Sequence, residues 1–165
     1  MHLDSLKKLY VHQLKDLYNA ETQVLEALPK MAKAASDDEL RAAFEKHTEE
    51  TRVHLGRLEK IFGGLDFEPG GQHCHAAEGL IKEAKELMRA NAEEPVLDAA
   101  LVAAAQRFEH YEMAGYGTAR AFAKKLGEHD AVELLTETLD EEAKTDRELT
   151  RLAERSINFE AMVAG

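Results

Sequence analysis

The chain contains no tryptophan, only three prolines and a single cysteine, Cys74. One cysteine cannot form a disulfide within the chain, which favours a reducing compartment. Runs of alternating β-branched residues, the mark of strands, are also missing. No apolar stretch approaches the roughly 20 residues that a membrane-spanning helix needs, and the start, Met-His-Leu-Asp, lacks the pattern of a signal peptide. We therefore expect a soluble, cytoplasmic protein.

Basic residues are scarce relative to acidic ones. The chain has 21 lysines and arginines against 32 aspartates and glutamates, a formal net charge of −11. Such a charge repels phosphate backbones and anionic lipids, so we expect neither a nucleic acid nor a membrane as partner. No glycine-rich phosphate loop follows a strand pattern, and no nucleophile can be paired with a base, so nucleotide binding and hydrolysis find no support.

What the chain does have is apolar residues at helical spacing. Alanine, glutamate, leucine and lysine abound, and these residues favour helix. Apolar positions recur every three or four residues in four long segments and one short one. The predicted long helices span residues 4–34, 37–62, 95–126 and 130–156, and the short helix spans residues 75–90. This pattern predicts one all-α domain over residues 1–165.

Local signals set the expected helix ends. Ser36 and Glu39 form a capping-box pattern, with Ser36 as the N-cap of the second helix. Gly63 and Gly64 are expected to end that helix, and Pro95 suits the first turn of the third long helix. Residues 157–165 show no periodic pattern.

The connections predict a topology. Short links should pack the first two long helices antiparallel, and likewise the last two. The short helix would then travel the length of the bundle within one long crossover. A single crossover of this kind predicts a ferritin-like four-helix bundle.

The segment His47–His54 breaks the apolar pattern of the second long helix. At about 100° per residue, Glu50 lies about 60° from His47 and about 40° from His54, so the three share a face with core leucines. Buried charged groups cost several kcal/mol unless they are paired, protonated or bound to metal. Two imidazoles and a carboxylate in the middle of a core helix therefore call for a partner.

Every long helix carries acidic residues near its midpoint. Packing four such helices side by side would gather these acids into one layer of the core. The predicted metal ligands are Glu21, Glu50, His54, Glu109, Glu112, Glu142 and Asp146, with His47 as an alternative source of nitrogen. Without cations, repulsion and desolvation would force most of the acids to hold protons. Two divalent ions would neutralise four charges, and carboxylate-rich ligation with nitrogen suits iron or manganese, with iron preferred.

Several motifs resemble a known family. They are Tyr-Asn-Ala-Glu at 18–21, His-Thr-Glu-Glu-Thr at 47–51, Glu-His-Tyr-Glu-Met-Ala-Gly-Tyr-Gly at 109–117, and Leu-Asp-Glu-Glu-Ala-Lys-Thr-Asp at 139–146. With these motifs the chain resembles the bacterial YciE/YciF-type ferritin-like stress proteins over nearly its whole length. The resemblance implies a ferritin-like bundle, a homodimer, a link to stress responses and a ferroxidase activity.

Two positions depart from the broader ferritin and rubrerythrin pattern, which places Glu-x-x-His on the second and fourth helices. Here Glu50 is followed at three residues by Val53, and His54 comes at four. Glu142 is followed at four by Asp146, with no histidine. A spacing of four keeps both groups on one face, about 40° apart, but with a different geometry.

Three further signals have competing interpretations. Tyr116, about 40° from Glu112, could support a metal ligand or could be an ordinary core tyrosine. His110 points to the side of its helix and could replace the histidine that the fourth helix lacks. His73-Cys74-His75 offers metal donors, but adjacent residues do not converge on one ion as helical i, i+4 pairs do, which favours a loop or helix cap.

Two hypotheses of different kinds follow. The first is a dimetal-carboxylate redox protein that reacts with dioxygen or hydrogen peroxide, as a ferroxidase, a peroxidase or a catalase-like enzyme. The alternative is a non-enzymatic, dimeric interaction protein whose carboxylate layer is a metal-free polar core. Metal storage is a third and weaker reading, because the chain has no evident means of building a large shell.

Overall fold

The computed structural model describes residues 3–164, and every regular element in that range is helical. The elements are α1 (Leu6–Ala34), α2 (Asp38–Leu65), α3 (His75–Leu87), α4 (Glu94–Leu126), α5 (His129–Leu152), a π-helical turn (Ala153–Ile157) and α6 (Asn158–Val163). The predicted all-α class is confirmed. None of the described helices is long and apolar enough to cross a membrane.

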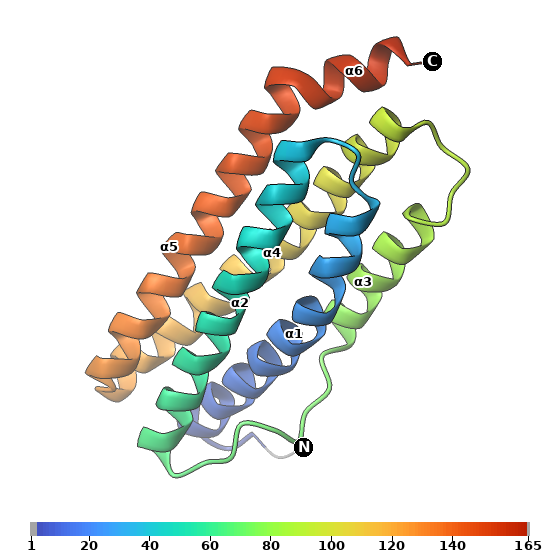
Figure 1. Ribbon diagram of the computed structural model, residues 1–165. Helices are drawn as coiled ribbons and strands as arrows, with labels where there is room; N and C mark the ends of the chain where they lie inside the picture. Colours follow the sequence, from blue (N-terminus) through green and yellow to red (C-terminus); the bar gives the residue numbers. More distant parts are fainter. Residues whose placement is uncertain (1–2, 165) are drawn as a thin grey trace.

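The four long helices form a bundle in which each neighbouring pair is antiparallel (Figure 1). α1 packs against α2 and α4, while α5 packs against α4 and α2. The chain leaves the end of α2, and α3 then travels back along the outside of the bundle against α1 and α4. This is the long crossover that the sequence predicted, and it lets both helical hairpins bring their midpoints to one level.

The start of α2 differs from the prediction. Asp37, not Ser36, is the N-cap, and its Oδ1 accepts a hydrogen bond from the Leu40 N–H at 2.7 Å. The Ser36 hydroxyl instead donates to Asp98 Oδ2 at 2.5 Å, and Asp98 also accepts the backbone N–H groups of Ser36 and Asp37. A buried carboxylate from α4 thus fixes this turn, a contact that a local sequence pattern cannot reveal.

Two helix ends also lie beyond their predicted positions. α2 continues through Gly63 and Gly64 and ends at Leu65, followed by Asp66 in the left-handed region at φ 57°. Burial of Phe62 and Leu65 holds this last turn in helical form despite the glycines. Near the C-terminus, the last predicted helix does not stop at Ser156. A π-helical turn carries it into α6, which bends away from the axis of α5 (Figure 1).

The core consists of two apolar clusters with a polar layer between them. One cluster includes Val24, Phe44 and Leu149, and the other includes Leu14 and Leu58. The acids and imidazoles at the helix midpoints fill the space between these clusters, where water has little access.

Candidate metal centre

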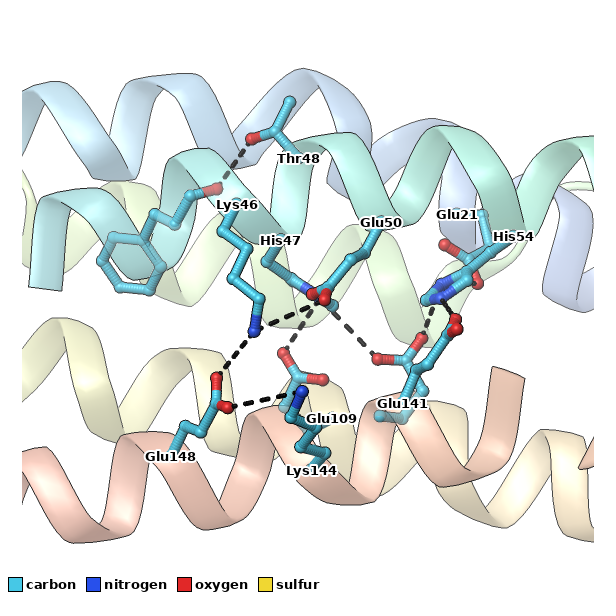
Figure 2. Close-up of polar contacts among 12 residues, drawn as sticks. Glu21, Lys46, His47, Thr48, Glu50, His54, Glu109, Glu141, Lys144 and Glu148 are labelled. Atoms are coloured by element: carbon cyan, nitrogen blue, oxygen red, sulfur yellow. Dashed lines mark hydrogen bonds and ion pairs between the residues drawn. The ribbon is translucent and has the colours of Figure 1, made fainter. Parts of the chain in front are cut away.

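Six ionisable side chains meet in the polar layer, and all are almost completely buried. They are Glu21 from α1, His47 and His54 from α2, Glu109 and Glu112 from α4, and Glu142 from α5, each no more than 2% exposed. Figure 2 shows His47 and His54 reaching from α2 toward carboxylates that lie between the helices. The local reason is periodicity, because His47 and His54 are seven residues apart and so lie only about 20° apart around the helix.

The donor atoms form two groups that share one residue. His47, Glu109, Glu112 and Glu142 make the first group, and Glu21, His54 and Glu142 make the second, with the atoms of each group within 4.8 Å of one another. Glu142 reaches toward both, with Oε2 at 3.8 Å from His47 Nε2 and Oε1 at 3.0 Å from His54 Nδ1. Because Glu142 belongs to both groups, its carboxylate would supply one oxygen to each.

Neighbouring side chains hold the second group in place. The Tyr116 hydroxyl donates to Glu21 Oε1 at 2.5 Å, and His54 Nδ1 lies 3.3 Å from the same oxygen. On its other side, His54 Nε2 is 2.9 Å from Glu141 Oε2, and Glu141 accepts two hydrogen bonds from Arg57. This support fixes the ring of His54 with Nδ1 aimed into the layer, as a metal-ligating histidine requires.

Many donor atoms in the layer lack a hydrogen-bond partner within the described residues. These atoms are Glu21 Oε2, both ring nitrogens of His47, His54 Nδ1, Glu109 Oε2, and both carboxyl oxygens of Glu112 and Glu142. Several lie within ion-pair distance, such as His47 Nε2 and Glu109 Oε1 at 3.2 Å, but without hydrogen-bond geometry. Buried polar atoms are rarely left unpaired, since each costs about 1–3 kcal/mol. These unpaired donor atoms are the kind of groups that a bound cation would satisfy.

The electrostatics of the layer point the same way. Burial, followed by the charges of Glu21 and Glu142, raises the pKa of Glu112 well above its usual value. Burial and the charge of Glu109 raise the pKa of Glu142 to about 7. Burial alone would lower the pKa of His54, but contacts with Glu142 and Glu21 raise it to about 10. Without metal, the layer therefore holds protons that cations can replace.

The donor set fits two divalent ions. Four glutamates supply four negative charges when ionised, which two divalent cations balance, and the two imidazoles supply one nitrogen to each group. Carboxylate oxygen with some imidazole nitrogen is the ligation typical of iron and manganese.

The chain is similar to known proteins over nearly its whole length. The domain of unknown function DUF892 matches residues 5–162. The chain belongs to the DUF892 family. Protein YciF of Escherichia coli strain K12 is 41% identical over 162 residues, which cover 98% of each chain. The suspected YciE/YciF resemblance is thereby confirmed.

Solved structures of relatives agree with the fold. The crystal structure of the E. coli stress protein YciF matches with a TM-score of 0.91 at 41% identity, covering 94% of this chain and 99% of that one. YcfI of Rhodopseudomonas palustris, described as a candidate structural protein, matches with a TM-score of 0.87 at 44% identity, covering 89% and 94%. A Xanthomonas campestris protein shares the fold alone, with a TM-score of 0.73 at 20% identity over 92% of each chain.

Within this family fold, five of the seven predicted ligands come together. Glu21, His54, Glu109, Glu112 and Glu142 all belong to the two donor groups, and the predicted alternative, His47, joins them. Tyr116 donates its hydroxyl hydrogen bond to Glu21, a contact that fits both a support for a metal ligand and a core tyrosine with a satisfied hydroxyl.

Two predicted ligands and one alternative lie outside both donor groups. Glu50 stands at the edge of the bundle, 3.4 Å from Lys46 Nζ and 3.6 Å from His47 Nδ1. Asp146 accepts a hydrogen bond from Gln106 at 3.0 Å and lies 3.3 Å from the exposed His110. Offsets of about 40° to 60° from the central face of each helix are enough to place Glu50 and Asp146 at the edge of the bundle.

Sequence reasoning overlooked two residues that orient the site. Arg57 lies three residues after His54 on the same helix face, so its spacing was a usable signal. Glu141 had no signal of its own, because it is one acid among many, and only the packing of α5 against α2 brings it to His54.

Proposed function

We propose that this protein binds two divalent ions, iron in preference to manganese, in the buried layer and reacts with dioxygen or hydrogen peroxide. The observation that carries the proposal is the pair of donor groups sharing Glu142, in which many buried donor atoms lack hydrogen-bond partners among the described residues. Bound iron or manganese would supply the electrons for reducing dioxygen or peroxide. The reaction class is ferroxidase, peroxidase or catalase-like, and the E. coli relative named as a stress protein supports a role in stress response.

The protein's own residues would prepare the site in three ways. Tyr116 holds Glu21 by a hydrogen bond, and the pair of Glu141 and Arg57 holds His54. The apolar clusters on both sides of the layer keep bulk water away. At the edge, Lys46 contacts Glu50 at 3.4 Å and Glu148 at 2.8 Å, and this chain of charges lies across the seam between α2 and α5 next to His47 (Figure 2).

Metal content tests the proposal directly. Protein purified without chelator or affinity tag is loaded with Fe²⁺ under anaerobic conditions and analysed for iron per chain. We expect about two ions in the native chain, because two donor groups are present. Glu142→Gln should lose most of both, since it removes the shared carboxylate, whereas Asp146→Asn, outside both groups, should keep the native content. Unchanged iron in Glu142→Gln would overturn the assignment.

Two observations favour the non-enzymatic alternative. His54 and His47 already form ion pairs with Glu142 and Glu109, so the layer is partly compensated without metal, and the R. palustris relative is described as a candidate structural protein. A native chain that takes up no iron, and whose stability is indifferent to chelators, would favour this function.

A homodimer in solution also belongs to the proposal, because the family resemblance implies it. Light scattering on the purified protein checks this directly. A mass equal to that of one chain would contradict it.

A further inference from the structure

A second group of metal donors lies on the surface, at the start of α3. His73 Nε2 is 3.0 Å from Glu78 Oε2, and His75 Nδ1 is 3.5 Å from the same oxygen. The two imidazole rings are 4.8 Å apart between centroids. All three side chains are exposed, unlike those of the buried layer.

The backbone explains why these side chains converge. Cys74 is extended, at φ −88° and ψ 97°, so the side chains before and after it leave on the side opposite to its own. His75 then begins α3, and Glu78, three residues later, lies on the same helix face. The convergence therefore uses alternate residues of the His-Cys-His sequence together with a glutamate one turn further on.

The body of the protein anchors this arrangement. The Cys74 N–H donates to Asn19 Oδ1 at 2.7 Å, and its carbonyl accepts a hydrogen bond from Gln23 at 3.0 Å. The Cys74 thiol points inward, 3.3 Å from Asp16 Oδ2 and 3.0 Å from the Tyr111 hydroxyl. With both its backbone and its side chain held by α1 and α4, Cys74 keeps the two flanking imidazoles in position, which lowers the entropy cost of binding an ion.

We propose that His73, His75 and Glu78 form a surface site for a late first-row divalent cation, Cu²⁺ or Zn²⁺. Donors at about 2.0–2.1 Å from one such ion lie about 2.9–3.4 Å apart, close to the 3.0 and 3.5 Å that separate the two histidine nitrogens from Glu78 Oε2. Two imidazoles with one carboxylate suit these metals, with Cu²⁺ bound more tightly than Zn²⁺, and water completes the coordination. Glu78 also offsets the unfavourable effect of the α3 N-terminus on a cation.

The site would clamp the end of the crossover loop to the first turn of α3. The buried thiol of Cys74 takes no part as a ligand, because it faces Asp16 and Tyr111 on the other side of the chain. The proposal does not depend on the buried layer, which has a different set of donors.

Calorimetric titration with Zn²⁺ and Cu²⁺ alone tests the site. The matched control is His129→Ala, because His129, like His75, is an exposed histidine at the first position of a helix. We expect His73→Ala and His75→Ala each to weaken one site per chain at least tenfold, while His129→Ala retains the native affinity. Circular dichroism checks that every variant keeps its helices.

The outcomes separate cleanly. Electron paramagnetic resonance of the first Cu²⁺ equivalent should show coupling to two nitrogens in the native chain and to fewer in His75→Ala. Native-like isotherms in both His73→Ala and His75→Ala would overturn the proposal. The buried layer is the same in the native chain and in the three histidine variants, so ions bound there contribute equally to every titration and the differences between variants report on the surface site.

Discussion

The two donor groups of the buried layer and the surface cluster use the same side chains, histidine and glutamate, in opposite surroundings. In the layer, every donor is at most 2% exposed and many lack hydrogen-bond partners. In the surface cluster, His73, His75 and Glu78 are half exposed or more, so water can satisfy them without an ion. Burial therefore sets how much a bound metal stabilises the folded state. Without an ion, a buried site keeps desolvated charges, whereas a surface site is hydrated.

The largest expected difference is in the effect of metal removal on stability. Removing the ions that we propose for the buried layer should lower the free energy of unfolding by about 4 kcal/mol or more, the linkage expected for a ligand a thousandfold above its dissociation constant. Urea unfolding of loaded and chelated protein at pH 7.5 measures this. His75→Ala serves as the control, and its response to chelation should match that of the native chain within about 1 kcal/mol. If loaded and chelated native protein were equally stable, metal in the buried layer would stabilise the fold no more than metal at the surface cluster.

The second expected difference is in the pH dependence of the metal-free protein. The pKa of Glu142 is raised to about 7 from an ordinary 4.5, so the folded state binds this proton more tightly than the unfolded state. Its contribution to stability is then complete below pH 4.5 and is lost as the pH rises through 7. His54, with its pKa raised to about 10, adds a loss of the same sign between pH 6.5 and 10.

We therefore expect metal-free protein to lose stability between pH 5 and pH 8, by roughly 1–3 kcal/mol. Urea unfolding over this range measures the slope. Glu142→Gln should flatten it, because the amide does not titrate, while Asp146→Asn should keep it. If the stability of the metal-free native protein rose with pH over this range, it would contradict the prediction that the layer buries acids with no cation to neutralise them.

The smallest expected effect concerns two glycines of α4 that lie two residues apart. A Cβ at Gly115 would come within 2.6 Å of Leu17 Cδ2 and 3.4 Å of Gln13 Nε2, whereas a Cβ at Gly117 would meet nothing within 4 Å. Leu17 is fully buried and cannot easily move aside. Gly115→Ala should therefore destabilise the fold by about 1–3 kcal/mol, and Gly117→Ala should stabilise it by about 0.5–1 kcal/mol.

Gly115→Ala also sharpens the comparison between the two regions. Forcing α4 away from α1 beside Glu112 and Glu21 should lower the affinity of the buried layer for metal, while the metal affinity of the surface cluster stays unchanged. Thermal unfolding together with metal titration of both glycine variants measures this. Equal stabilities of the two variants would show that the helices do not approach closely at Gly115.

Much of the fold could be predicted from the sequence because it rests on short-range physics. The 3.6-residue period sets which faces are apolar, and the short links after Ala34 and Leu126 require antiparallel neighbours, which the structure confirms. The misplaced N-cap at Ser36 and the extension through Gly63 have a different origin. There, contacts with Asp98 and burial of Phe62 overrode the local preferences, and both involve residues distant in the chain or in another helix.

The composition of the buried layer shows the same division. The sequence by itself determined that each long helix would place an acid near its midpoint and that His47 and His54 would share a face, because these follow from helical spacing. Only the tertiary structure decided that Glu142 stands between both imidazoles while Glu50 and Asp146 turn outward. An offset of 40° to 60° around a helix has no fixed meaning until the neighbouring helices set how wide the buried face is. In the surface cluster, too, the tertiary structure contributes, because the contact of Cys74 with Asn19 fixes the backbone between His73 and His75, which lie beside Glu78.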